Sequence, residues 1–176
     1  MAFANSGADL ALLDMSVDRQ EETKSKCEKF GAKVQTYACN ITDATAVHDT
    51  FEQIVSSLGP VDILVNNAGV TGNKFAVNET FNDFWRVMEV NLKGPALCIY
   101  EVIKSMKERK TGCIINMSSR SATVDMPTGL SYNSSKAAIV RVTGTLQAEF
   151  DADGLGEQVH CYALHPGGVW TDLFKG

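Results

Sequence analysis

The chain has 176 residues, of which 44% are hydrophobic and 21% charged, and its net charge is −5. This length suits a single domain with a sizeable core, and an acidic balance without a basic block argues against a nucleic-acid-binding surface. The first ten residues lack the cationic start and apolar core of a signal peptide, and no apolar run approaches the roughly 20 residues that span a bilayer. We therefore expect a soluble, cytoplasmic protein without a membrane partner.

Short apolar runs alternate with amphipathic segments along the chain, with no linker between them. We expect strands at 9–14, 33–38, 61–65, 113–117 and 159–164, and helices at 17–30, 43–58, 80–109 and 132–150. Such alternation predicts right-handed βαβ units and an α/β fold, a Rossmann-like doubly wound parallel sheet with helices on both faces. Ligands bind beyond the carboxyl ends of the strands in such sheets.

Two of the predicted helices have apolar positions on one face. In the helix that Thr42 or Asp43 caps, this face comprises Val47, Phe51, Ile54, Val55 and Leu58. In the helix that Thr80 caps, the predicted buried stripe comprises Phe81, Trp85, Met88, Leu92, Ile99, Ile103 and Met106. The five cysteines are scattered without C-x-x-C spacing, so we expect reduced cysteines and no metal site.

Tyr132 and Lys136 lie four residues apart at the start of a predicted helix and therefore share one face. A phenol, with a reference pKa near 10, is a poor base at neutral pH, but a cation within about 6 Å favours the phenolate. The pair can thus serve as a general acid–base. Alone, a Y-x-x-x-K spacing is common and also fits an ordinary helix surface.

Two further polar residues lie near this pair in the predicted fold. Ser119 follows the strand at 113–117, where its hydroxyl can reach the same carbonyl oxygen as the phenol, although a loop serine is usually a turn residue. Asn91 lies in mid-helix, four residues before Pro95, which has no N–H to bond the Asn91 carbonyl. We expect a kink there that leaves this carbonyl free for water; in isolation, Asn91 also reads as a surface asparagine.

Asp14 ends the first predicted strand. A carboxylate at this place can accept both hydroxyls of an adenosine ribose and would repel a 2′-phosphate. The competing interpretation is a strand-terminal aspartate that begins a turn.

Together these residues resemble the classical short-chain dehydrogenase/reductase family. The matching motifs follow the family order across essentially the whole chain: Asp14, Asn40-Ile41, Asn66-Asn67-Ala68-Gly69, Asn91, Ser119, Tyr132-Asn133-Ser134-Ser135-Lys136 and Pro166-Gly167-Gly168-Val169-Trp170-Thr171. The resemblance implies hydride transfer between NAD, or alternatively NADP, and a secondary alcohol or its ketone or aldehyde. It also implies a homodimer or homotetramer formed through the helices at 80–109 and 132–150.

The resemblance assigns a role to each matching residue. Tyr132 would be the acid–base, Ser119 would orient the substrate oxygen, and Lys136 would tune the tyrosine and hold the nicotinamide ribose. Asn91 would anchor a water in a proton relay. The residues implied to contact the cofactor are Asp14, Asn40, Ile41, Asn67, Ala68, Gly69, Tyr132, Lys136, Pro166, Gly167, Val169 and Thr171. Asn40 stands where the family often has Asp, and its amide can still bond adenine.

The chain departs from the family pattern at both ends. The Gly-rich phosphate loop T-G-x-x-x-G-x-G is absent, and the sequence ends where the family's substrate lid would follow. We interpret residues 1–176 as one incomplete Rossmann-like domain. In the expected strand order, 3-2-1-4-5-6, the missing strand is central, so its two neighbours would have unpaired edges.

Two other functions fit the sequence. A catalytically impaired remnant would act only as a binding or oligomerisation module, and an epimerase or dehydratase would use the same Tyr–Lys pair in a longer chain with a sugar-nucleotide domain. The sequence does not identify the substrate. The residues expected to select it are Ser121–Leu130 and the region after Val70. Val124, Met126 and Leu130 suggest a partly apolar pocket but equally suit loop packing.

Overall fold

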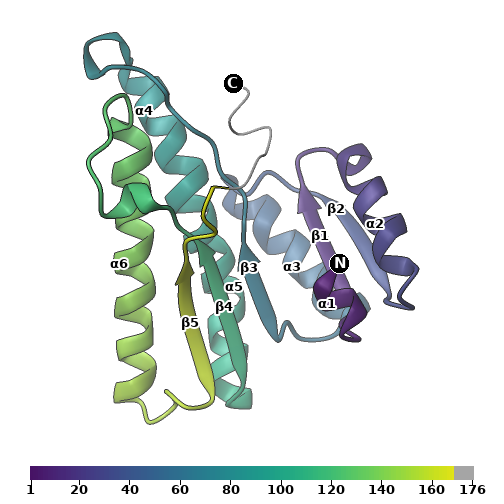
Figure 1. The fold of residues 1–176 in the computed structure, drawn as a ribbon. Coiled ribbons are helices and arrows are strands. Elements are labelled where there is room, and N and C mark those ends of the chain that lie inside the picture. Colours follow the sequence, from purple (N-terminus) through teal and green to yellow (C-terminus); the bar gives the residue numbers. More distant parts are fainter. Residues whose placement is uncertain (169–176) are drawn as a thin grey trace. The chain divides into compact units, whose positions relative to one another are not determined.

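The computed structural model describes residues 1–168 and divides the chain into two compact units, Met1–Pro60 and a second that begins at Val61. Strands and helices alternate through both units (Figure 1). Every strand pair is parallel. The alternation and the parallel pairing confirm the predicted α/β class.

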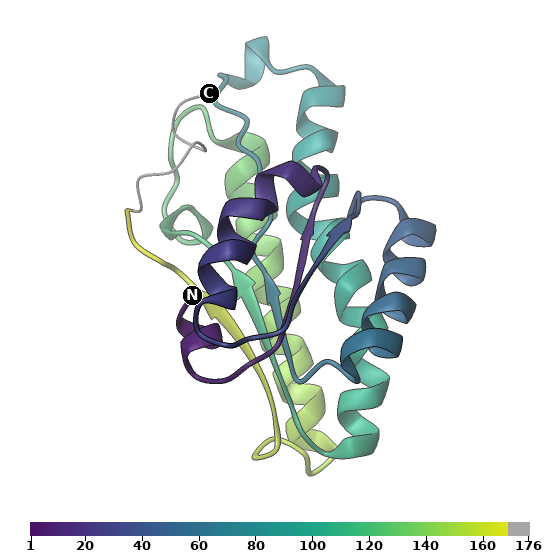
Figure 2. The ribbon, with the colours of Figure 1, turned by 90° about the vertical axis from the view of Figure 1, so that its right-hand side faces the viewer.

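The first unit is built on a two-stranded sheet. Its elements are α1 (Ala2–Asn5), β1 (Leu10–Asp14), a 3₁₀ turn (Val17–Gln20), α2 (Glu21–Glu28), β2 (Val34–Ala38) and α3 (Ala44–Leu58). The register runs from Leu10 opposite Val34 to Asp14 opposite Ala38, and α2 and α3 lie on opposite faces of this sheet (Figure 2). Asp14 therefore ends one strand beside the end of its neighbour.

Helix α3 begins as the sequence predicts. The Asp43 side chain caps it by accepting from the backbone N–H groups of Thr45 and Ala46. Of the predicted apolar face, Val47, Phe51 and Ile54 are buried and Leu58 is half-buried. Val55 is 49% exposed, so its predicted burial was wrong. Val55 lies beside the buried stripe that the other three side chains form along α3.

The second unit is built on a three-stranded sheet in the order β3-β4-β5. Its elements are β3 (Ile63–Asn66), a 3₁₀ turn (Ala76–Asn78), α4 (Phe81–Met88), a π-helical turn (Glu89–Lys93), α5 (Gly94–Arg109), β4 (Gly112–Met117), a 3₁₀ turn (Arg120–Ala122), α6 (Leu130–Ala152) and β5 (Val159–Leu164). Helices α5 and α6 lie on one face of this sheet (Figure 2). None of the helices in residues 1–168 is long and apolar enough to cross a membrane.

The helical run from α4 to α5 corrects the predicted stripe. Ile99 and Met106 are buried as expected, but Phe81 is 74% and Trp85 50% exposed, and Val87 is buried instead. The predicted stripe kept a single period of 3.6 residues through the kink that was expected near Asn91. The π-helical turn at Glu89–Lys93 places more residues in one turn, so the apolar positions before and after it fall on different faces.

The strands of the two sheets leave edges without a partner. Among the described strands, β1 pairs only with β2, and β3 pairs only with β4. Apolar side chains also remain exposed on the sheet face opposite α5 and α6: Ile63, Val65, Tyr162 and Leu164.

Candidate active site

Tyr132 and Lys136 lie in the first two turns of α6, as predicted. The Lys136 ammonium lies 5.6 Å from the centroid of the Tyr132 ring. Its Nζ donates a 2.7 Å hydrogen bond to the backbone carbonyl of Met117, at the end of β4. Lys136 is only 5% exposed, and this burial lowers the pKa of its side chain. The carbonyl of Met117 at the end of β4 thus holds the buried Lys136 ammonium near the Tyr132 ring.

Ser119 follows the same strand end and is half-buried. Its hydroxyl oxygen accepts a 3.2 Å hydrogen bond from the backbone N–H of Ser121 and so caps the short 3₁₀ turn. No hydrogen bond joins Ser119 to Tyr132 within residues 1–168. Ser119 therefore lies two residues after the carbonyl that holds Lys136, with its hydroxyl proton free to donate elsewhere.

Asn91 is 1% exposed, which contradicts its interpretation as a surface asparagine. Its Oδ1 accepts from the backbone N–H of Val70 at 2.8 Å, and its Nδ2 donates to the Val70 carbonyl at 2.9 Å and to the Ser135 hydroxyl at 3.1 Å. The π-helical turn at Glu89–Lys93 is the backbone irregularity at the place where a kink was expected. The Asn91 side chain thereby ties the loop after β3 to α6.

The loop after β3 approaches the two polar side chains closely. A Cβ built on Gly69 would lie 3.4 Å from Asn91 Oδ1 and 3.7 Å from Lys136 Nζ. Asn67 and Ala68, just before it, are exposed. The structure therefore brings together Gly69, Asn91, Lys136 and Tyr132, which come from three separate segments of the sequence.

A buried network that the sequence did not predict lies beneath these groups. Asn66 Nδ2 donates to Asn116 Oδ1 at 2.8 Å across the β3–β4 pair, and Asn116 Nδ2 donates to Thr143 Oγ1 at 2.9 Å. Thr143 in turn donates to the Ile139 carbonyl within α6. All three side chains are buried, so the network links both strand ends to the tyrosine-bearing helix. Its only sequence signal is an asparagine near the end of each apolar strand.

The remaining predicted residues that can be placed lie at strand ends. In the first unit, Asp14 Oδ1 accepts from the backbone N–H of Ser16 at 3.0 Å, which is the turn that the competing interpretation describes. Asn40 Oδ1 accepts from the N–H and the hydroxyl of Thr42, and Ile41 is half-buried. Asp14 and Asn40 end or follow adjacent parallel strands.

The predicted segment after β5 is described only in part. Pro166 and Gly167 are exposed, and Gly167 has a φ of 81°. Val169 and Thr171 lie outside the described residues. No group of three or more metal-ligating side chains occurs among residues 1–168. All five cysteines are free, and four of them are buried.

Comparison with known proteins gives one consistent result. A family model described as short chain dehydrogenase matches residues 1–176. A short chain dehydrogenase of Pseudocercospora fijiensis is 37% identical over 98% of this chain and 55% of its own length. A 3-oxoacyl-[acyl-carrier-protein] reductase of Thermotoga maritima is 30% identical over 98% of this chain and 69% of its own length. The chain thus spans about half to two-thirds of these relatives.

Solved structures share the same arrangement. An alcohol dehydrogenase from Thermococcus sibiricus, complexed with 5-hydroxy-NADP, matches with a TM-score of 0.88 and 28% identity over 97% of this chain and 70% of its own. An NAD⁺-bound xylitol dehydrogenase matches with a TM-score of 0.86 and 28% identity over 93% of this chain and 62% of its own.

Proposed function

The chain belongs to the short-chain dehydrogenase family, and on that premise we propose that its protein interconverts a secondary alcohol and a ketone or aldehyde with NAD or NADP. The observation that carries this proposal is the Lys136 ammonium, buried and anchored by the Met117 carbonyl, 5.6 Å from the centre of the Tyr132 ring. This is the arrangement that a phenolic acid–base requires. A small alcohol or carbonyl compound is the substrate class.

The described residues fit a nicotinamide dinucleotide. Lys136 uses one of its three N–H donors on Met117, and the others have no partner among residues 1–168, so they can bond ribose hydroxyls. The absence of a Cβ at Gly69 keeps the space before this ammonium open. In the first unit, Asp14 Oδ2 can accept from the adenosine ribose, and Asn40 and Ile41 lie at the next strand end. When bound, the dinucleotide donates or accepts the hydride.

Tyr132 moves the proton that accompanies the hydride. In the direction of reduction, its phenol donates a proton to the carbonyl oxygen of the substrate; in oxidation, its phenolate takes the proton of the alcohol. The Lys136 ammonium, 5.6 Å from the centroid of the Tyr132 ring, would attract the negative charge that develops on the phenol oxygen during proton transfer. Ser119 holds the same substrate oxygen through its free hydroxyl proton. Asn91 fixes the loop beside Lys136, and its backbone carbonyl anchors a water that returns protons to the pair.

The carboxylate of Asp14 favours NAD over NADP, because a 2′-phosphate beside it would be repelled. The substrate pocket would be formed by Ser121–Leu130 and the loop after Val70. Val124, Met126 and Leu130 are exposed there, which supports a partly apolar pocket. The exposed Phe81, Trp85 and Tyr100 on α4 and α5 support assembly into a dimer or tetramer through these helices.

The test of this function is the Tyr132→Phe variant, assayed for NAD(H)-dependent turnover of a panel of secondary alcohols and ketones. We expect kcat to fall by about 10³-fold, since positioned acid–base groups contribute about 10² to 10⁴. Tyr162→Phe removes an exposed hydroxyl from β5 and is the matched control. Unchanged turnover in Tyr132→Phe would exclude the mechanism. A folded chain that binds no NADH would favour a binding or oligomerisation module instead.

A further inference from the structure

The helix that carries Tyr132 begins without a side-chain cap of its own. Its N-cap residue is Gly129, whereas Asp43 caps α3 and Thr80 caps α4 through a reciprocal capping box with Asp83. The first N–H groups of a helix have no partner within the helix, and its N-terminus attracts negative charge. The preceding loop contributes one side-chain bond to this turn, from Asn133 Nδ2 to the Met126 carbonyl at 3.2 Å.

A carboxylate distant in sequence meets this turn at Ser131, the residue before Tyr132. The Ser131 side chain is fully buried, and its hydroxyl donates a 2.5 Å hydrogen bond to Glu79 Oε1 across 52 residues of sequence. A short bond of this kind is typical of a hydroxyl paired with a carboxylate. Within residues 1–168, Glu79 Oε2 is buried without a partner, so the carboxylate is oriented through Oε1.

The loop after β3 closes over this hydrogen bond. A Cβ built on Gly72 would lie 2.4 Å from Ser131 Oγ and 2.8 Å from Glu79 Oε1, so glycine fits here without displacing the pair. Lys74 forms an isolated parallel bridge with Gly129. Three segments thus converge on the start of α6.

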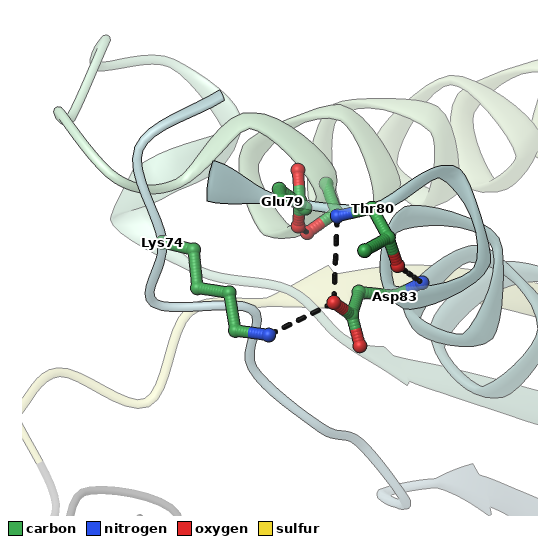
Figure 3. A network of polar contacts seen from close by, with 5 residues as sticks. Lys74, Glu79, Thr80 and Asp83 are labelled. Atoms are coloured by element: carbon green, nitrogen blue, oxygen red, sulfur yellow. Dashed lines mark hydrogen bonds and ion pairs between the residues drawn. The ribbon is translucent and has the colours of Figure 1, made fainter. Parts of the chain in front are cut away.

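The carboxylate itself is fixed by its place in the chain. Glu79 directly precedes Thr80, whose hydroxyl accepts from the Asp83 N–H at 3.1 Å (Figure 3). Asp83 Oδ2 pairs with Lys74 Nζ at 2.8 Å. The capping box and the ion pair anchor both the start of α4 and the loop above it. Glu79 therefore directly precedes a helix start that is both capped and ion-paired.

We propose that Glu79 is a positioning residue for Tyr132, acting through Ser131 to fix the first turn of α6. Glu79 need not touch the substrate: it sets where the phenol lies relative to the Lys136 ammonium and the end of β4. This proposal rests on the proposed function, in which Tyr132 transfers the proton. Misplacement of a reacting group by about 1 Å can cost about 10²-fold in rate.

The test is a double-mutant cycle on kcat and KM with Glu79→Ala, Ser131→Ala and the double variant. We expect each single variant to lower kcat about tenfold with the KM for the cofactor unchanged, and the double variant to lose no more than either single one. Glu79→Gln keeps an acceptor for Ser131 and should recover kcat to within about threefold. Glu149→Gln, an exposed carboxylate near the end of α6, is the control.

Amide hydrogen exchange supplies a readout that needs no turnover. Glu79→Ala should speed exchange in the first turns of α6, from Ser131 to Lys136, and leave the rest of the helix protected. If the protein had no dehydrogenase activity, the proposed function would fail while this local effect still reported on Glu79. Unchanged exchange and kcat in Glu79→Ala, or a double variant whose loss equals the product of the single losses, would overturn the proposal.

Discussion

The two units hold their candidate site residues in different ways. In the unit that begins at Val61, buried side chains are fixed by bonds to distant segments, as Asn91 is by Val70 and Ser135. In Met1–Pro60, Asp14 and Asn40 are held by local bonds to Ser16 and Thr42, two residues away in each case.

This difference has a chemical meaning. Proton transfer needs groups placed to within fractions of an ångström, and buried hydrogen bonds supply such placement before a substrate arrives. A ribose can be held by a carboxylate at a strand end that still adjusts its rotamer. We infer that Asn91 and Lys136 are organised in advance by the chain's own packing, whereas Asp14 and Asn40, the candidate contacts of the adenosine, are oriented by local turns alone.

The largest expected effect on stability separates Asn91 from Asn40. Asn91→Ala leaves the N–H and carbonyl of Val70 without their side-chain partner, and it should lower the free energy of unfolding by about 3 kcal/mol, since each buried unsatisfied group costs about 1–3. Asn40→Ala removes exposed bonds and should change it by less than about 0.5 kcal/mol. Urea unfolding of both variants measures the difference. Equal losses would remove the contrast between the units.

A smaller effect is expected for Asp14. Asp14→Arg should weaken NADH binding at least tenfold, about 1.4 kcal/mol, because the carboxylate that would accept the ribose hydroxyls is lost. Stability should hardly change, since the Asp14 side chain accepts only the local bond from Ser16 among the described residues. Titration of NADH fluorescence measures the affinity, with Asp18→Arg as the neighbouring control. Wild-type affinity in Asp14→Arg would remove Asp14 from the cofactor site.

The smallest effect concerns pH. Burial lowers the pKa of Lys136, so between that lowered value and the ordinary lysine value of about 10.4 the unfolded chain binds more protons than the folded one. The free energy of unfolding of the wild type, relative to that of Lys136→Met, should therefore increase as the pH rises through this window. Urea unfolding at pH 7 and pH 10 checks the sign. If the stability of the wild type relative to Lys136→Met decreased as the pH rose, the burial of a charged Lys136 would be contradicted.

The sequence predicted the elements better than their contacts. Strand 159–164 was predicted with its observed bounds, because its apolar run is flanked by turns. The stripe that included Phe81 and Trp85 was wrong, because nothing in the periodicity marks the π-helical turn after them. Hydrophobic periodicity predicts which residues share a face only in a regular helix. It does not account for a single wider turn.

The site was predictable where residues act at fixed spacing. Tyr132 and Lys136 meet because they are four residues apart on one helix. The Glu79–Ser131 bond joins residues 52 positions apart, so it depends on how α4 and α6 pack. The burial of Asn91 likewise follows from packing, which the sequence alone does not determine.

The contrast between the two units is tested most directly by hydrogen exchange at three loop amides, each bonded to a side-chain oxygen. The Val70 N–H donates to the buried Asn91, whereas the N–H groups of Ser16 and Thr42 donate to Asp14 and Asn40. We predict that the Val70 amide exchanges at least about 100-fold more slowly than the other two, because its acceptor belongs to a side chain that is 1% exposed and is also bonded to Ser135 on α6. Comparable exchange at all three amides would contradict the view that only the proton-transfer residues are organised in advance.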